Sequence, residues 1–358
     1  MALIKKGLTT TQIIVGGFAA AIFIGSLLLM LPIAAKTNTA TPYIDALFTS
    51  TTSICVTGLV TVVTAEHWSF FGQVVIMLLI ELGGLGVVTF TTGVLMIFRR
   101  RITLKDRLLI QDAYNLNTLK GLVRLTRRIV RGTLVVEGVG ALLYMSVFIR
   151  DFGFLKGFWM GIFTSVSAFC NAGIDLVGPD SLAPYVSNFT INMTTMLLII
   201  FGGIGFPVWW DIIDAIHSIK AKKNTVKTAV RKLHLHSKIA LTMTLILIFG
   251  GALLVYLFEY NNPDTMGNYS LGTKILASFF QSVTTRTAGF FTISQGGMRP
   301  STVILSILLM FTGGSPSGTA GGIKTVTLAV VVLAAVSMIK GNNSIEAYHR
   351  KIADAYVK

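Results

Sequence analysis

The sequence predicts an all-α integral membrane protein made of repeated units, each a membrane span, a short re-entrant helix and a second span. Composition is the first reason: hydrophobic residues form 53% of the 358 residues and charged residues only 13%, about half the charged share of soluble domains. Long apolar runs and two short motifs that recur three times are the others. Together they argue against a disordered chain, a disulfide-stapled domain or a soluble enzyme.

Six apolar runs are long enough to cross a bilayer, which takes about 20 helical residues. They cover 11–33, 70–98, 129–149, 189–216, 239–260 and 301–339. Three shorter runs lie between successive long ones, at 43–59, 157–174 and 271–293. The order is therefore long, short, long, three times over. A short run between two spans is typical of a segment that dips into the membrane and returns.

Positive charge fixes the expected orientation. Of the 30 Lys and Arg residues, 24 lie at the N-terminus, in the connections between triplets, near the end of the last run and in the tail. By the positive-inside rule these parts are cytoplasmic. We thus expect a multi-pass protein of the cell membrane with a cytoplasmic N-terminus, surrounded by lipid and without a face for nucleic acid. The expected units are pore repeats 1–98, 129–216 and 239–339, basic linkers 99–128 and 217–238, and a tail 340–358.

Two motifs recur in the same order. In the short runs, Phe48, Phe163 and Phe279 each lie ten residues before a glycine, and these glycines, Gly58, Gly173 and Gly289, are 115 and 116 positions apart. In the following long runs, a Gly-Gly pair recurs at 83–84, 202–203 and 313–314. Recurrence of unit, spacing and order indicates an internal repeat.

The short runs are rich in Ser and Thr and end in a glycine turn, so they cannot span. Each is predicted to enter as a half helix and to leave as extended backbone, which is tolerated at membrane depth only against protein or a water-filled path. Carbonyl oxygens gathered in this way replace the hydration shell of a cation. The alternative from the residues alone is that the small residues form close helix-packing seams.

The glycine turns resemble the filter loops of the Trk/Ktr/HKT superfamily of potassium transporters, and most closely those of the Ktr-type membrane subunit. The resemblance covers nearly the whole chain. It implies that potassium is bound by main-chain carbonyls of Val56, Thr57, Gly58, Leu59, Asn171, Ala172, Gly173, Ile174, Thr287, Ala288, Gly289 and Phe290. Gly58, where sodium-selective members have Ser, implies potassium as the main ion and leaves sodium coupling open.

The same resemblance implies an assembly. Family members have four repeats around a pseudo-fourfold pore, whereas three are present here, so we expect a C-terminally incomplete chain that does not conduct selectively alone. The resemblance also implies a homodimer that carries a ring of cytoplasmic nucleotide-binding regulatory subunits. No cofactor is expected beyond the transported ion.

The last long run is predicted to be broken. Residues 312–322 contain five Gly, one Pro and two Ser, which interrupt a helix. The stretch 312–325 resembles the intramembrane gate loop of the family. The gate residues are Gly313, Gly314, Ser315, Pro316, Ser317, Gly318, Thr319, Ala320, Gly321, Gly322 and Lys324. Lys324 is interpreted either as an electrostatic barrier or as a side chain that reaches the cytoplasmic interface.

Ionisable residues inside spans mark candidate functional groups. Arg286 is predicted to support the third filter turn, since its charge excludes cation ligation. For Glu81 and Glu137 we favour helix-packing hydrogen bonds over ion ligation, and Cys55 and Cys170 are interpreted as packing residues. No metal-ligand spacing or catalytic motif is present, so an enzyme is not predicted. The predicted function is channel-like potassium uptake; the alternative is a secondary transporter for an organic solute.

Overall fold

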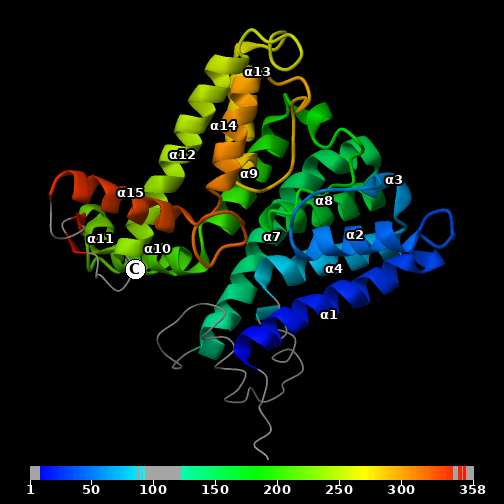
Figure 1. Cartoon of the computed structure of the whole chain (residues 1–358), viewed down its shortest axis with the longest axis horizontal. Coiled ribbons are helices and arrows are strands. Elements are labelled where there is room, and N and C mark those ends of the chain that lie inside the picture. Colours follow the sequence, from blue (N-terminus) through cyan, green and yellow to red (C-terminus); the bar gives the residue numbers. More distant parts are fainter. Residues whose placement is uncertain are drawn as a thin grey trace, which may run out of the picture. The chain divides into compact units, whose positions relative to one another are not determined.

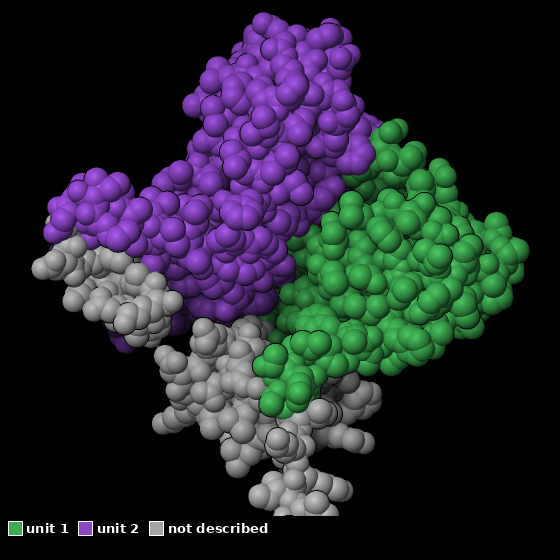
Figure 2. Space-filling model, viewed as in Figure 1, with its two compact units in different colours: residues 1–181 green, residues 182–358 purple. Residues whose placement is uncertain are grey.

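The computed structural model describes residues 9–86, 89–90, 92, 122–341, 346–348 and 350–351 (Figure 1). The described residues are mostly helical, as predicted. They fall into two compact units, residues 1–181 and 182–358, which Figure 2 colours separately. Most of the expected linker 99–128 lies outside the described residues.

The first unit begins with a long helix and a shorter one folded against it. Helix α1 spans Thr10–Met30 and opens with a capping box in which Thr9 and Gln12 exchange hydrogen bonds. Helices α2 (Tyr43–Ile54) and α4 (Phe70–Leu85) both contact α1 and each other. A 3₁₀ turn (η1, Pro32–Ala34) and the short helix α3 (Thr64–His67) join them.

A tight helical hairpin completes the first unit. Helix α7 spans Leu122–Phe152 and α8 spans Phe154–Phe169. Gly153 joins them at φ +80°, a conformation that glycine adopts without steric cost. Gly157 permits the close packing, because a Cβ there would lie 2.5 Å from the Phe148 carbonyl oxygen. Helix α8 also packs on α4.

The second unit is organised around α12 (Leu235–Glu259), which packs on α13 (Leu271–Thr284), α14 (Pro300–Phe311) and α15 (Thr325–Ile339). Its other elements are η2 (Ala183–Tyr185), α9 (Phe189–Gly203), α10 (Phe206–Lys220) and α11 (Val226–Lys232). Helix α9 packs against α13. The break expected within 312–322 lies where α14 ends and α15 has not begun.

The expected long run 189–216 is not one straight helix. It is split between α9 and α10, which are bent by 101°. Gly205 at the break has φ +91° and Pro207 stands in the first turn of α10, so neither residue continues the preceding helix. Similarly, α4 ends before Gly86, which has φ +79°. Among the described residues, α1, α7 and α12 alone have the length and hydropathy of a span, with the bent pair as a fourth candidate.

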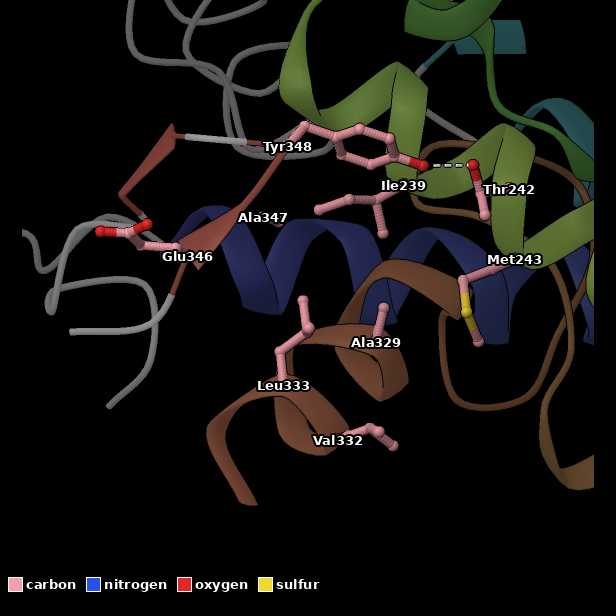
Figure 3. A pocket seen from close by; sticks show the side chains of 9 residues that line it. All are labelled: Ile239, Thr242, Met243, Ala329, Val332, Leu333, Glu346, Ala347 and Tyr348. Carbon is pink, nitrogen blue, oxygen red and sulfur yellow. Dashed lines mark hydrogen bonds between the residues drawn. The ribbon is translucent and has the colours of Figure 1, made fainter. Parts of the chain in front are cut away.

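The tail contains the exception to the all-α prediction. Strands β1 (Glu346–Ala347) and β2 (Arg350–Lys351) pair antiparallel, with Glu346 opposite Lys351. The hairpin covers an apolar pocket of about 360 Å³ between α12 and α15 (Figure 3). There the Tyr348 hydroxyl hydrogen-bonds the Thr242 hydroxyl. Part of the expected linker 340–358 is therefore folded onto the second unit.

Candidate functional site

The first and second predicted turns lie side by side in the first unit. The first turn (56–59) follows the C-terminus of α2 and the second turn (171–174) follows that of α8. A Cβ on Gly58 would lie 2.6 Å from the Ala172 carbonyl oxygen. Residues more than 110 positions apart in the sequence therefore bring their main chains together at this point. The third turn (287–290) follows α13 in the second unit.

The three turns share one backbone shape. Val56, Asn171 and Thr287 have φ of 53°, 62° and 66°, and the glycines two positions later, Gly58, Gly173 and Gly289, have φ of 81°, 66° and 91°. Positive φ is rare outside glycine and is costly for a β-branched residue such as Val56, by about 1–3 kcal/mol. Three separate segments that hold the same unfavourable geometry indicate a shared functional demand.

Hydroxyl groups anchor each turn to its own helix. In the first two turns the backbone N–H after the glycine donates to a side chain: Leu59 to Thr52 Oγ1 and Ile174 to Ser167 Oγ, both at 3.0 Å. In the third, Thr284 Oγ1 donates to the Phe290 carbonyl at 2.5 Å. The sequence motif did not single these residues out. The sequence feature that could have identified them is a hydroxyl residue six positions before the turn glycine in the first two copies and five positions before it in the third. Relative to its glycine, the anchoring residue of the third copy is therefore shifted by one position.

The first Gly-Gly pair allows the C-terminal ends of α2 and α8 to pack closely against α4. A Cβ on Gly83 would overlap the Ile54 carbonyl oxygen at the end of α2. A Cβ on Gly84 would lie 2.5 Å from the sulfur of Cys170, which caps α8. Helix α4 thus approaches the ends of α2 and α8 through adjacent glycines, which explains why no larger residue stands at either position.

In the second unit, the predicted gate loop docks into the break between α9 and α10. The Gly203 carbonyl accepts from Ser315 N at 2.7 Å and the Gly202 carbonyl from Thr319 N at 3.0 Å. Across the break, Phe206 N donates to the Ser317 carbonyl at 3.0 Å. The second Gly-Gly pair therefore offers main-chain oxygens to the loop rather than seating a helix end.

The loop is closed on itself and tied to the third turn. Gly314 N donates to the Gly321 carbonyl at 3.2 Å, and the hydroxyls of Ser315 and Thr325 are 2.8 Å apart. Gly321 N then donates to Thr287 Oγ1 at 2.8 Å. Through this bond the loop and the predicted filter turn share one hydrogen-bond network.

The two basic candidates are held by oxygen atoms. Arg286 is 2% exposed, and its Nη2 donates to Thr244 Oγ1 on α12 at 3.3 Å. This places the guanidinium between α12 and α13, where it can support the third turn. Lys324 Nζ donates to the Ala320 carbonyl at 2.6 Å within the loop, so its amine stays with the loop.

Glu81 and Glu137 meet Cys170 in the first unit. Cys170 Sγ donates to Glu81 Oε2 at 3.5 Å, and the sulfur and one oxygen of each carboxylate lie within 4.8 Å of one another. Ser165 Oγ donates to the Glu137 carbonyl at 2.7 Å, which fastens α8 to α7. Sequence analysis did not predict that these three residues meet, because they are far apart along the chain.

The sequence is similar to known cation transport proteins. The family model TrkH, described as cation transport protein, matches residues 7–354. The potassium/sodium uptake protein NtpJ of Enterococcus hirae is 40% identical over 354 residues, which are 99% of this chain and 75% of that protein. The Ktr system potassium uptake protein B of Bacillus subtilis is 38% identical, covering 96% of this chain and 74% of that protein.

A solved structure shows the same fold. The crystal structure of the potassium transporter TrkH from Vibrio parahaemolyticus matches with a TM-score of 0.67 at 16% identity. The match covers 95% of this chain and 64% of that chain. The family model and the two relatives confirm the resemblance to the Trk/Ktr/HKT superfamily that the turns indicated, and the matched family is one of cation transporters. The chain belongs to the TrkH family of membrane cation transport proteins.

Proposed function

We propose that the chain is a membrane subunit for potassium uptake, in which each of the three turns offers main-chain oxygens to a dehydrated cation. The observation that carries this proposal is the shared backbone of the turns, with left-handed residues at Val56, Asn171 and Thr287 and again at the glycines. Alternating backbone twist of this kind presents successive carbonyl oxygens to one side, as a cation filter requires. A fourth turn, implied by the family resemblance, has no counterpart among the described residues.

The helices before the turns favour the same ion. Helices α2, α8 and α13 all end where a turn begins. The negative ends of their dipoles therefore adjoin the turns and stabilise a cation there. The membrane potential, worth about 2.3 kcal/mol per charge at 100 mV, would drive potassium inward. No acidic side chain is needed as a ligand.

The loop 312–325 is proposed to gate this path. Its hydrogen bonds to Gly202, Gly203 and Thr287 hold it in one position. Opening then requires that these bonds exchange for others, which makes the loop a two-state element. We further propose a cytoplasmic N-terminus, a homodimer and a separate cytoplasmic nucleotide-binding regulator. The name Ktr system, carried by a relative, fits a transporter of several components.

Potassium uptake into a bacterium that lacks its own potassium transporters tests the proposal. When a fourth turn is joined to the chain after residue 358, we expect growth at low potassium and potassium-selective flux, both sensitive to Gly58→Ser. The 358 residues alone should not conduct selectively, because three turns leave the path incomplete. Gly250→Ser is the matched control, because Gly250 lies in α12 with nothing within 4 Å of its Cβ position. An unchanged potassium-to-sodium ratio in Gly58→Ser, together with altered uptake of an organic solute, would instead support the secondary transporter.

A further inference from the structure

Two glutamates and a cysteine converge beside the second turn. Glu81 comes from α4, Glu137 from α7, and Cys170 caps α8 immediately before Asn171. Their sulfur and carboxylate oxygens lie within 4.8 Å of one another. We call these three side chains the carboxyl cluster.

Within the part of the chain that the structure describes, the carboxyl cluster has no compensating cation. Among the described residues neither glutamate forms a salt bridge; the ion pair found there joins His234 and Asp211. Glu137 is 5% exposed, and its Oε1 is buried without a hydrogen-bond partner. On the described residues of α4, α7 and α8, the acidic and thiol groups that come together here are the two carboxyls and the Cys170 thiol.

Glu81 is half-buried and Glu137 is buried. Two carboxyl groups this close are not both ionised, because their negative charges repel each other. A single proton removes the repulsion and supplies the missing hydrogen-bond donor. Complete protonation would leave more donors than the site uses, since the thiol already donates to Glu81. The state that satisfies the cluster has one proton and one negative charge.

We propose that Glu81 and Glu137 form a proton-binding site that holds one shared proton, and that its remaining negative charge strengthens cation binding at the second turn. The second part rests on the proposed function. The charge lies close to the second turn in the chain of contacts, because Cys170 hydrogen-bonds to Glu81 and directly precedes Asn171, the left-handed residue that begins the turn. Both glutamates are thus positioning residues for the ion rather than ligands.

Glutamine substitutions can count the charge. Glutamine has the shape of a protonated glutamate, so Glu81→Gln or Glu137→Gln leaves one ionised carboxylate, whereas the double variant leaves none. Infrared absorption by protonated carboxyl groups reads the proton without transport. We expect an equal loss of this band in each single variant and no further loss in the double variant. Glu66→Gln, an exposed glutamate on α3, is the control and should lose nothing.

Two other infrared results would overturn the shared proton. Half the loss in each single variant and the full loss in the double variant means two protons. No loss in any variant means none. If the double variant does not fold, the two single variants still decide whether the proton is shared. The loss of one whole proton in each single variant arises only when either substitution removes the same proton. The band area is calibrated against a known number of protonated carboxyls.

Potassium dependence of uptake tests the role of the charge. The half-saturating potassium concentration should stay within about twofold of wild type in both single variants. It should rise about tenfold in the double variant, the factor expected when one unit charge about 12 Å from the ion is lost at an effective dielectric of about 20. An unchanged value in the double variant would refute the role in ion binding. If the protein with a fourth turn joined to it showed no potassium uptake, the proposed function itself would be contradicted. The infrared proton count does not depend on transport and would be judged separately.

Discussion

Removing the hydroxyl of Thr287 should weaken the closed gate. Its Oγ1 accepts from Gly321 N at 2.8 Å, the direct bond between the loop and the third turn. Gly321 is exposed, so water replaces the lost partner and the net cost is at the lower end for a hydrogen bond, about 0.5–1 kcal/mol. Since about 1.4 kcal/mol is a factor of ten, Thr287→Val should raise the open population about two- to fivefold.

Rubidium flux into vesicles that contain the membrane subunit without a regulator measures this population. Thr287→Val keeps the β-branched shape, whereas Thr287→Ser keeps the hydroxyl and should behave like wild type. Thr285→Val is the neighbouring control, because the Thr285 hydroxyl bonds only to carbonyls of its own helix, at Gln281 and Ser282. Flux in Thr287→Val that is equal to or below wild type would refute the role of this bond in closure.

Two further predictions concern packing and the turns. Gly84→Ala should lower the free energy of unfolding by about 1–3 kcal/mol, because its methyl group meets Cys170; Gly138→Ala in α7, with nothing within 4 Å, should be neutral or stabilising by up to about 1 kcal/mol. Thermal unfolding in detergent compares them, and equal effects would contradict the seating of α8 on α4. Ser167→Ala should reduce potassium-to-sodium selectivity in flux assays more than it lowers thermal stability, because Ile174 N loses its anchor; unchanged selectivity would show that the anchor is dispensable.

The spacing of apolar runs was sufficient to predict a mostly helical membrane protein. Hydropathy reports which residues avoid water, and it therefore located α1, α7 and α12 well. It did not locate the breaks at Gly86 and Gly205, where the chain remains apolar while the backbone turns. Composition carries no information on φ, and a glycine within an apolar run signals a bend only after its neighbours are known.

The side-chain contacts of the site were beyond the sequence for another reason. Thr52, Ser167 and Thr284 are ordinary residues of amphipathic helices until the chain doubles back to place Leu59, Ile174 and Phe290 beside them. The carboxyl cluster likewise needs three helices to be assembled first. A repeat detected by glycine spacing fixes the common backbone, and the polar contacts that differ between copies remain hidden.

The Gly-Gly pair shows how one repeated motif acquires different tasks. In the first copy, Gly83 and Gly84 lack side chains so that two helix ends can approach α4. In the second copy, the carbonyls of Gly202 and Gly203 bind the loop that begins with the third copy, Gly313 and Gly314. All three Gly-Gly pairs allow another chain segment to approach closely. They differ in which segment that is. The position of the loop therefore depends on the bent helix pair as well as on the sequence of the loop itself. Substitutions at Gly205 should disturb the gate as strongly as substitutions within the loop, because a Cβ at Gly205 would overlap the Pro316 carbonyl oxygen.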